Sequence, residues 1–180
     1  GTYHISVYLS SAVDTVYSDD TLRMDYTVNK IQLPYDVDFS TRPSELIFKQ
    51  VQGIVNWEVE AGTGSNPVIA PAFGTGRLTF ASESGIGSVA QVILNGLDLR
   101  GMLHPKLEFW YAHDASSTEN DFIRVKMSTD GGASTQVLQT IYRYDAAYTT
   151  PAWVYYEIDL SAFDSASCLS LIIEGSSFGG

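Results

Sequence analysis

The sequence predicts an all-β sandwich with little helix, and two observations support this fold class. Apolar and polar residues alternate with a period of two along several short segments, which is the pattern of half-buried strands. No stretch of a dozen residues shows helical periodicity, and Gly, Pro, Asn and Asp turn signals recur between the segments. A chain of 180 residues is also long enough to build a sizeable core without a disulfide.

Residues 1–29 are expected to form a β-hairpin of their own. Two alternating runs, at about residues 3–9 and 22–28, are joined by an acidic loop whose aspartates fit a solvated turn better than a calcium loop. A two-stranded hairpin is marginally stable alone in water, so this segment needs a partner. We place a domain boundary near Asn29, and the second domain then covers residues 30–180.

The second domain is expected to be a succession of strands and turns. Pro34 interrupts regular pairing before a short acidic strand that ends at Phe39. Residues 46–51 fit either a strand or a helical turn. Residues 107–132 organise the rest: they predict a central hairpin of two long strands with a polar loop, closed by a tight Asp-Gly-Gly turn. Further strands are expected near residues 78–80, 89–94, 135–144, 153–160 and 169–174.

Composition excludes several classes of function. A net charge of −11 and a pI near 4.4 argue against binding to nucleic acid, which requires clustered Lys and Arg. No apolar run approaches the roughly 18 residues of a membrane span. Cys168 is the single cysteine, and its apolar surroundings predict a small buried thiol in a strand. From the abrupt start at Gly1 we expect the sequence to be an excised piece of a longer protein, with neighbouring domains on the parent chain.

Seven motifs in a fixed order carry a resemblance that covers about residues 31–180. They are LPYDVDF, NWEVEAGTG, LNGLDLRG, PKLEFWYAH, NDFIRVKMSTDGG, PAWVYYEIDLSAF and LSLIIEGSSFGG. Together they resemble the MAM-like jelly-roll modules of secreted, Bacteroidetes-type proteins, including the cleaved-adhesin domains of gingipain-type proteases. Residues 1–29 resemble the last hairpin of an immunoglobulin-like bacterial surface domain. The resemblance implies an antiparallel jelly roll of two sheets, of the concanavalin A-like class, on an extracellular or cell-surface protein.

The same resemblance implies a structural calcium site near the first strand of the module. Members of the family often carry E-D-F-E there, and the matching residues here are Val37, Asp38, Phe39 and Ser40. Asp38 is therefore kept, both glutamates are absent, and Asp36 is the residue that can substitute. These two aspartates would supply two of the six to eight oxygen ligands that calcium takes.

Exposed aromatic side chains are the candidate ligand-binding residues, because their faces stack on pyranose rings. Trp110 is out of phase with its core-facing neighbours and is the first candidate. The tyrosines on or near strands that can flank it are Tyr142, Tyr144, Tyr148 and Tyr155. The alternative is that they are ordinary half-buried packing residues, as expected of many tyrosines in a chain with 12% aromatics.

The sequence offers little support for catalysis. It contains no nucleophile, metalloprotease or nucleotide-binding motif, and the adjacent His113 and Asp114 are expected to point apart in a loop. Glu108, Glu157 and Asp159 lie opposite the core-facing residues, but their spacing singles out no catalytic pair. The preferred hypothesis is a non-catalytic adhesion module that binds a glycan or an extracellular protein. The alternatives are a structural spacer beside a catalytic domain and, second, a concanavalin-like glycoside hydrolase.

Overall fold

The structure is a computed structural model, and it divides the chain into two compact units, Gly1–Lys30 and Ile31–Gly180. It describes the backbone of residues 2–8, 21–27, 30–64, 66–114, 119–143 and 150–178, and the side chains from residue 30 onward within those ranges. In the first unit, β1 (Thr2–Tyr8) and β2 (Thr21–Thr27) form an antiparallel hairpin. The assignment of this hairpin to a preceding immunoglobulin-like domain stays a prediction.

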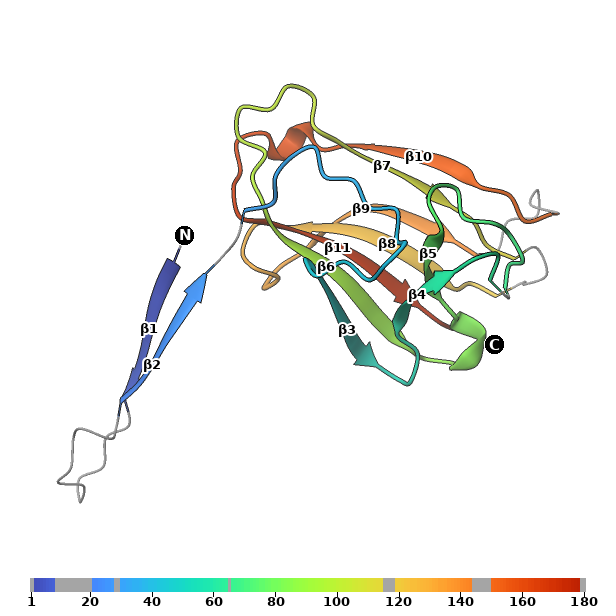
Figure 1. The fold of residues 1–180 in the computed structure, drawn as a ribbon, viewed down its shortest axis with the longest axis horizontal. Helices are drawn as coiled ribbons and strands as arrows, with labels where there is room; N and C mark the ends of the chain where they lie inside the picture. Colours follow the sequence, from blue (N-terminus) through green and yellow to red (C-terminus); the bar gives the residue numbers. More distant parts are fainter. Residues whose placement is uncertain are drawn as a thin grey trace, which may run out of the picture. The chain divides into compact units, whose positions relative to one another are not determined.

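The second unit is built on one five-stranded antiparallel sheet, in the order β3-β6-β11-β8-β9 (Figure 1). Its strands are β3 (Leu46–Gln52), β6 (Val89–Leu97), β8 (Phe122–Ser128), β9 (Gln136–Tyr142) and β11 (Leu169–Ser176). Apolar side chains alternate along these strands, so one face of the sheet is apolar and faces the second layer.

The second layer consists of two separate two-stranded ribbons. One joins β4 (Trp57–Ala61) to β5 (Gly76–Phe80), and the other joins β7 (Lys106–Tyr111) to β10 (Val154–Asp159). The only helical turns in the described ranges are the 3-10 segments η1 (Ser82–Ser84) and η2 (Ser161–Phe163). The all-β antiparallel sandwich with little helix is therefore confirmed. The layer opposite the five-stranded sheet is split rather than continuous.

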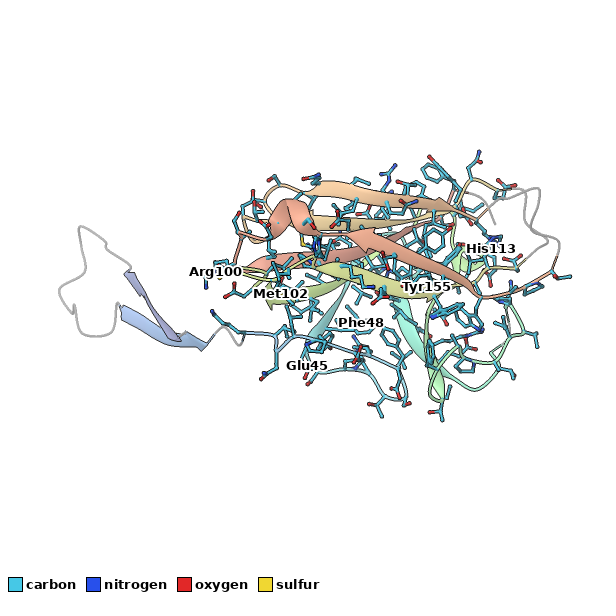
Figure 2. All side chains as sticks on the ribbon, turned by 90° about the horizontal axis from the view of Figure 1, so that it is seen from above. Glu45, Phe48, Arg100, Met102, His113 and Tyr155 are labelled. Atoms are coloured by element: carbon cyan, nitrogen blue, oxygen red, sulfur yellow. The ribbon has the colours of Figure 1, made fainter. Side chains whose placement is uncertain are left out.

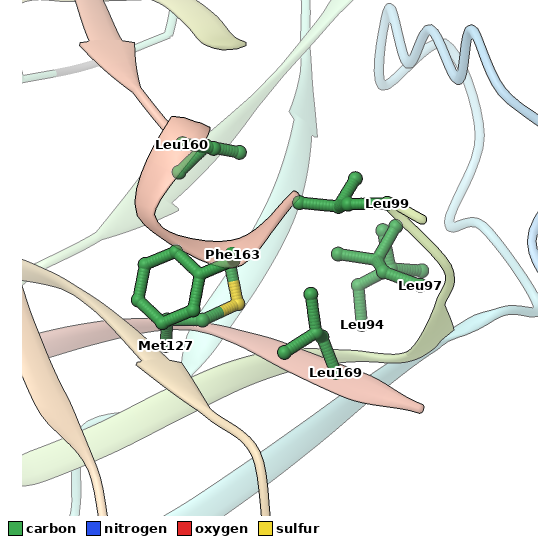
Figure 3. Close-up of a cluster of buried hydrophobic side chains, with 7 residues drawn as sticks. All are labelled: Leu94, Leu97, Leu99, Met127, Leu160, Phe163 and Leu169. Carbon is green, nitrogen blue, oxygen red and sulfur yellow. The ribbon is translucent and has the colours of Figure 1, made fainter. Parts of the chain in front are cut away.

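Two clusters of buried side chains hold the layers together. Figure 3 shows the first cluster, which joins strands β6, β8 and β11 to the 3-10 segment η2. Its members lie in these elements or directly beside them: Leu94, Leu97, Leu99, Met127, Leu160, Phe163 and Leu169. Leu107 of β7 and Ile158 of β10 pack against it, which anchors that ribbon. The second cluster contains Trp57 of β4, whose indole N–H donates to the carbonyl of Ala90 at 3.1 Å.

The predicted central hairpin over residues 107–132 is wrong. β7 pairs with β10 in the second layer, whereas β8 pairs with β11 and β9 in the five-stranded sheet. Alternation fixes which face of a strand is buried but not which strand is its neighbour, so two strands of opposite layers look like a hairpin in the sequence. The Asp-Gly-Gly turn does close a hairpin, that of β8 and β9. Gly131 and Gly132 adopt φ values of 70° and 95° there.

Two smaller expectations are also wrong. The acidic strand that was expected to end at Phe39 is not paired: the segment 31–40 alternates half-buried and exposed residues outside any sheet. Cys168 is exposed rather than buried, because it occupies a turn just before β11 at a φ of 59°. The run of apolar residues that indicated burial begins one residue later, at Leu169, which is fully buried.

Candidate functional site

Three exposed aromatic side chains form a continuous surface, which we call the aromatic strip: Phe73, Trp110 and Tyr155. Trp110 of β7 and Tyr155 of β10 are cross-strand partners, and their ring centroids lie 5.5 Å apart. Phe73 comes from the loop between β4 and β5 and meets Trp110 edge-on at 6.1 Å. The three residues are 65%, 42% and 45% exposed respectively. Figure 2 looks onto this ribbon and shows Tyr155 on its outer surface.

Alternation along β7 and β10 explains why these side chains face outward. Leu107 and Phe109 turn toward the core, so Glu108 and Trp110 must point to the opposite side. The same period places Tyr155 and Glu157 outside while Tyr156 stacks on Phe109 within the layer. The outer face of the ribbon therefore carries an aromatic rung followed by an acidic rung.

The acidic rung, which we call the acidic pair, consists of the cross-strand partners Glu108 and Glu157. Lys106 lies between them, with its ammonium nitrogen 3.0 Å from Oε1 of Glu108 and 3.0 Å from Oε2 of Glu157. The Tyr155 hydroxyl donates to Oε1 of Glu108 and lies 3.2 Å from Oε2 of Glu157. Aromatic strip and acidic pair are thus joined through one tyrosine.

These hydrogen bonds set the protonation of the group. The Tyr155 hydroxyl and then the Lys106 ammonium stabilise the ionised form of Glu108 and lower its pKa. The bond to the Glu108 carboxylate raises the pKa of Tyr155 to about 12, and the bonds to both glutamates raise that of Lys106. At neutral pH, then, Tyr155 stays a neutral donor and Glu108 a charged acceptor.

Two contacts position the loop that carries Phe73. The buried guanidinium of Arg77 donates from Nη1 to the carbonyls of Pro67 and Ile69, at 2.9 and 3.3 Å. Trp153, just before β10, donates from its indole N–H to the carbonyl of Ala70 at 2.7 Å. The loop is therefore fixed both to its own ribbon and to the ribbon that carries the rest of the strip.

A cleft of ≈ 120 Å³ lies beside the strip, and Trp110 and Trp153 line it. Its polar part is a largely buried cluster in which Arg143 donates to Asp114 and Asp121, at 2.9 Å each. His113 lies 2.6 Å from the backbone carbonyl oxygen of Asp114, not from its carboxylate. The two adjacent residues are therefore not arranged as a histidine–carboxylate acid–base pair.

The residues predicted to bind calcium are both exposed and stand before β3. Both carboxylate oxygens of Asp38 accept hydrogen bonds from Ser40, at 2.9 Å from its backbone N–H and 2.8 Å from its hydroxyl, and these bonds lower the pKa of Asp38. Within the ranges that the structure describes, no group of three or more His, Cys, Asp or Glu side chains is arranged to hold a metal ion. Calcium binding by Asp36 and Asp38 stays a prediction.

The predicted aromatic candidates do not all meet. Trp110 and Tyr155 are adjacent, as described above. Tyr142 is 54% exposed but belongs to β9 in the five-stranded sheet, where its ring lies 6.2 Å from that of Phe122. Tyr144 and Tyr148 lie outside the described residues. Phe73 was not among the residues predicted from the sequence; the available signal was a lone aromatic residue in a loop otherwise rich in Gly, Pro and Ala.

These observations rest on the structure of the chain itself. In the described part of the chain no helix has the length and apolar character needed to cross a membrane. No protein-family model matches the chain, and no curated protein matches it. The resemblance to MAM-like and cleaved-adhesin modules therefore remains an expectation from the sequence motifs.

Proposed function

We propose that residues 30–180 form a non-catalytic, glycan-binding adhesion module of a secreted or cell-surface bacterial protein. The observation that carries the proposal is the aromatic strip. Three neighbouring aromatic rings, each 42–65% exposed, keep apolar surface in water, and a contiguous patch of this kind typically marks a binding site.

The chemistry of the ribbon fits a sugar better than a purely apolar ligand. A pyranose ring has an apolar C–H face, which stacks on aromatic rings, and an edge of hydroxyl groups that require acceptors. The strip supplies the stacking surface, and Glu108 and Glu157 supply carboxylate acceptors on the adjacent rung. A ligand that lies across Trp110 and Tyr155 therefore meets both kinds of contact at once.

The same rung is poorly suited to glycoside hydrolysis. A hydrolase needs one carboxyl group that stays protonated, with a raised pKa, opposite a second carboxylate across the scissile bond. Here the pKa of Glu108 is lowered, and both glutamates lie side by side on an open face and share Lys106. This arrangement favours binding over catalysis.

The proposal is tested by measuring the binding of a panel of soluble neutral polysaccharides with affinity electrophoresis and calorimetry. Hydroxyethyl cellulose, xylan, xyloglucan and galactomannan are suitable members. We expect at least one to bind, and Trp110→Ala to weaken that binding about tenfold, which corresponds to about 1.4 kcal/mol of lost stacking. Because Trp110 is only partly buried, the melting temperature of the Trp110→Ala variant should differ little from that of wild type.

Tyr142→Ala is the matched control, since it also removes an exposed aromatic ring but from the other layer. It should leave the affinity within about twofold of wild type. If both variants lose the same amount of affinity, the aromatic strip is not the binding site. No binding anywhere in the panel would overturn the proposal and favour the structural spacer, and sugar released from any member would favour the hydrolase.

A further inference from the structure

The acidic pair indicates which class of glycan binds, provided that the binding function proposed above is correct. We infer that the ligand is a glycan without acidic groups, and that Glu108 and Glu157 select it by accepting hydrogen bonds from its hydroxyls and repelling carboxylates and sulfates.

The charges of the acidic pair lie next to the aromatic strip. Glu108 and Glu157 occupy the rung next to Trp110 and Tyr155, so they lie about 7 Å along the strands from the stacking surface. A sugar ring that covers the aromatic rung therefore extends its edge toward the two carboxylates. Lys106 neutralises only one of the two negative charges. The rung keeps a net negative charge, on a chain whose net charge is −11.

Each carboxylate of the acidic pair has one oxygen with unused hydrogen-bonding capacity. Lys106 and Tyr155 bind through Oε1 of Glu108 and Oε2 of Glu157. The other oxygen of each carboxylate accepts no hydrogen bond from any residue that the structure describes. A carboxylate has about four lone-pair sites and no donor, so these oxygens can only accept. Hydroxyl groups satisfy them, whereas a uronate or sulfate group brings a second acceptor and a like charge.

Hydrogen bonds order the acidic pair in the absence of a ligand. The shared ammonium and the tyrosine hydroxyl hold both carboxylates in place before any ligand arrives, which reduces the entropy lost on binding. The 46% and 51% exposure of the two side chains leaves them open to a ligand. The pair is thus an accessible, fixed acceptor site rather than a buried structural ion pair.

The test compares two polymers that differ in charge but share a backbone: polygalacturonate and highly methyl-esterified pectin. Fully neutral xyloglucan and hydroxyethyl cellulose are measured beside them at about 20 mM and about 500 mM NaCl. We expect the esterified and neutral polymers to bind at least tenfold more tightly than polygalacturonate at low salt. The difference should shrink at high salt, because salt screens the repulsion between exposed charges.

Glu157→Gln removes one charge and keeps the size of the side chain. At low salt, the ratio of the affinity for the esterified polymer to that for polygalacturonate should fall about fivefold. This is the effect of removing one unit charge at about 4 Å in water. Glu45→Gln is the control, because it changes the net charge equally from an exposed position just before β3. It should leave the preference unchanged.

The outcomes separate this inference from the function on which it rests. If polygalacturonate binds as tightly as its ester, or if Glu45→Gln and Glu157→Gln act alike, the selection by the acidic pair is refuted while glycan binding stands. If none of these polymers and no member of the neutral panel described above binds to the wild-type protein, the proposed function itself fails.

Discussion

Leu169→Ala tests whether the five-stranded sheet and the β7–β10 ribbon share one packed core. Leu169 has 0% exposure and lies in the cluster with Met127 and Phe163. The change removes three buried carbon atoms, worth about 0.8 kcal/mol each, and leaves a cavity that raises the total to about 3–5 kcal/mol. For a domain of this size that loss lowers the melting temperature by about 6–20 °C.

Urea denaturation followed by tryptophan fluorescence measures this loss directly. We expect a lower midpoint with an unchanged slope, because the surface exposed on unfolding stays the same. Leu103→Ala is the control: it removes the same atoms from a side chain that is 89% exposed, and should cost less than about 0.5 kcal/mol. If the two variants lose similar stability, the cluster is not the core that the structure describes.

Three further predictions concern charged residues. Arg77→Met should lower the free energy of unfolding by about 2–3 kcal/mol in urea titrations, because it removes the ion pair with Glu60 and the hydrogen bonds to two loop carbonyls; a loss below about 1 kcal/mol would contradict this. Hydrogen bonds from its turn lower the pKa of Asp130 to about 2, so its stabilising contribution is present above about pH 4 and lost as the pH falls toward 2. The stability difference between wild type and Asp130→Asn should therefore shrink over that range in acid titrations, and a constant difference would refute the assignment. If Asp36 and Asp38 bind calcium, adding it to chelated protein should raise the melting temperature of wild type but not of the double Asn variant, and no shift in wild type would exclude the site.

Much of the strand content was predictable from alternation alone. Leu107, Phe109 and Ile158 face the core, and Glu108 and Trp110 face outward, as the period of two required. This local pattern was sufficient to identify Trp110 as a candidate binding residue. The turn at residues 130–132 was also predictable, because few residues other than glycine tolerate its positive φ values.

Several errors have the same physical origin, which is that pairing between distant strands leaves no mark in a single sequence. Trp110 and Tyr155 are 45 positions apart, and nothing local to either shows that they are cross-strand partners. For the same reason, the sequence did not show that Glu108 and Glu157 both contact Lys106. Phe73 sits in a loop without regular periodicity, so no pattern indicated which way its ring points.

The loop that carries Phe73 is attached to the sandwich through backbone carbonyls, which Arg77 and Trp153 bind whatever the neighbouring side chains are. Because these bonds do not involve the Phe73 side chain, a substitution there is expected to leave the two layers undisturbed. If the aromatic strip binds a glycan as proposed, changes at Phe73 are expected to alter which glycan is bound. We expect sequence changes in this loop to be tolerated, while Trp110 and Tyr155 keep their positions as cross-strand partners on the ribbon.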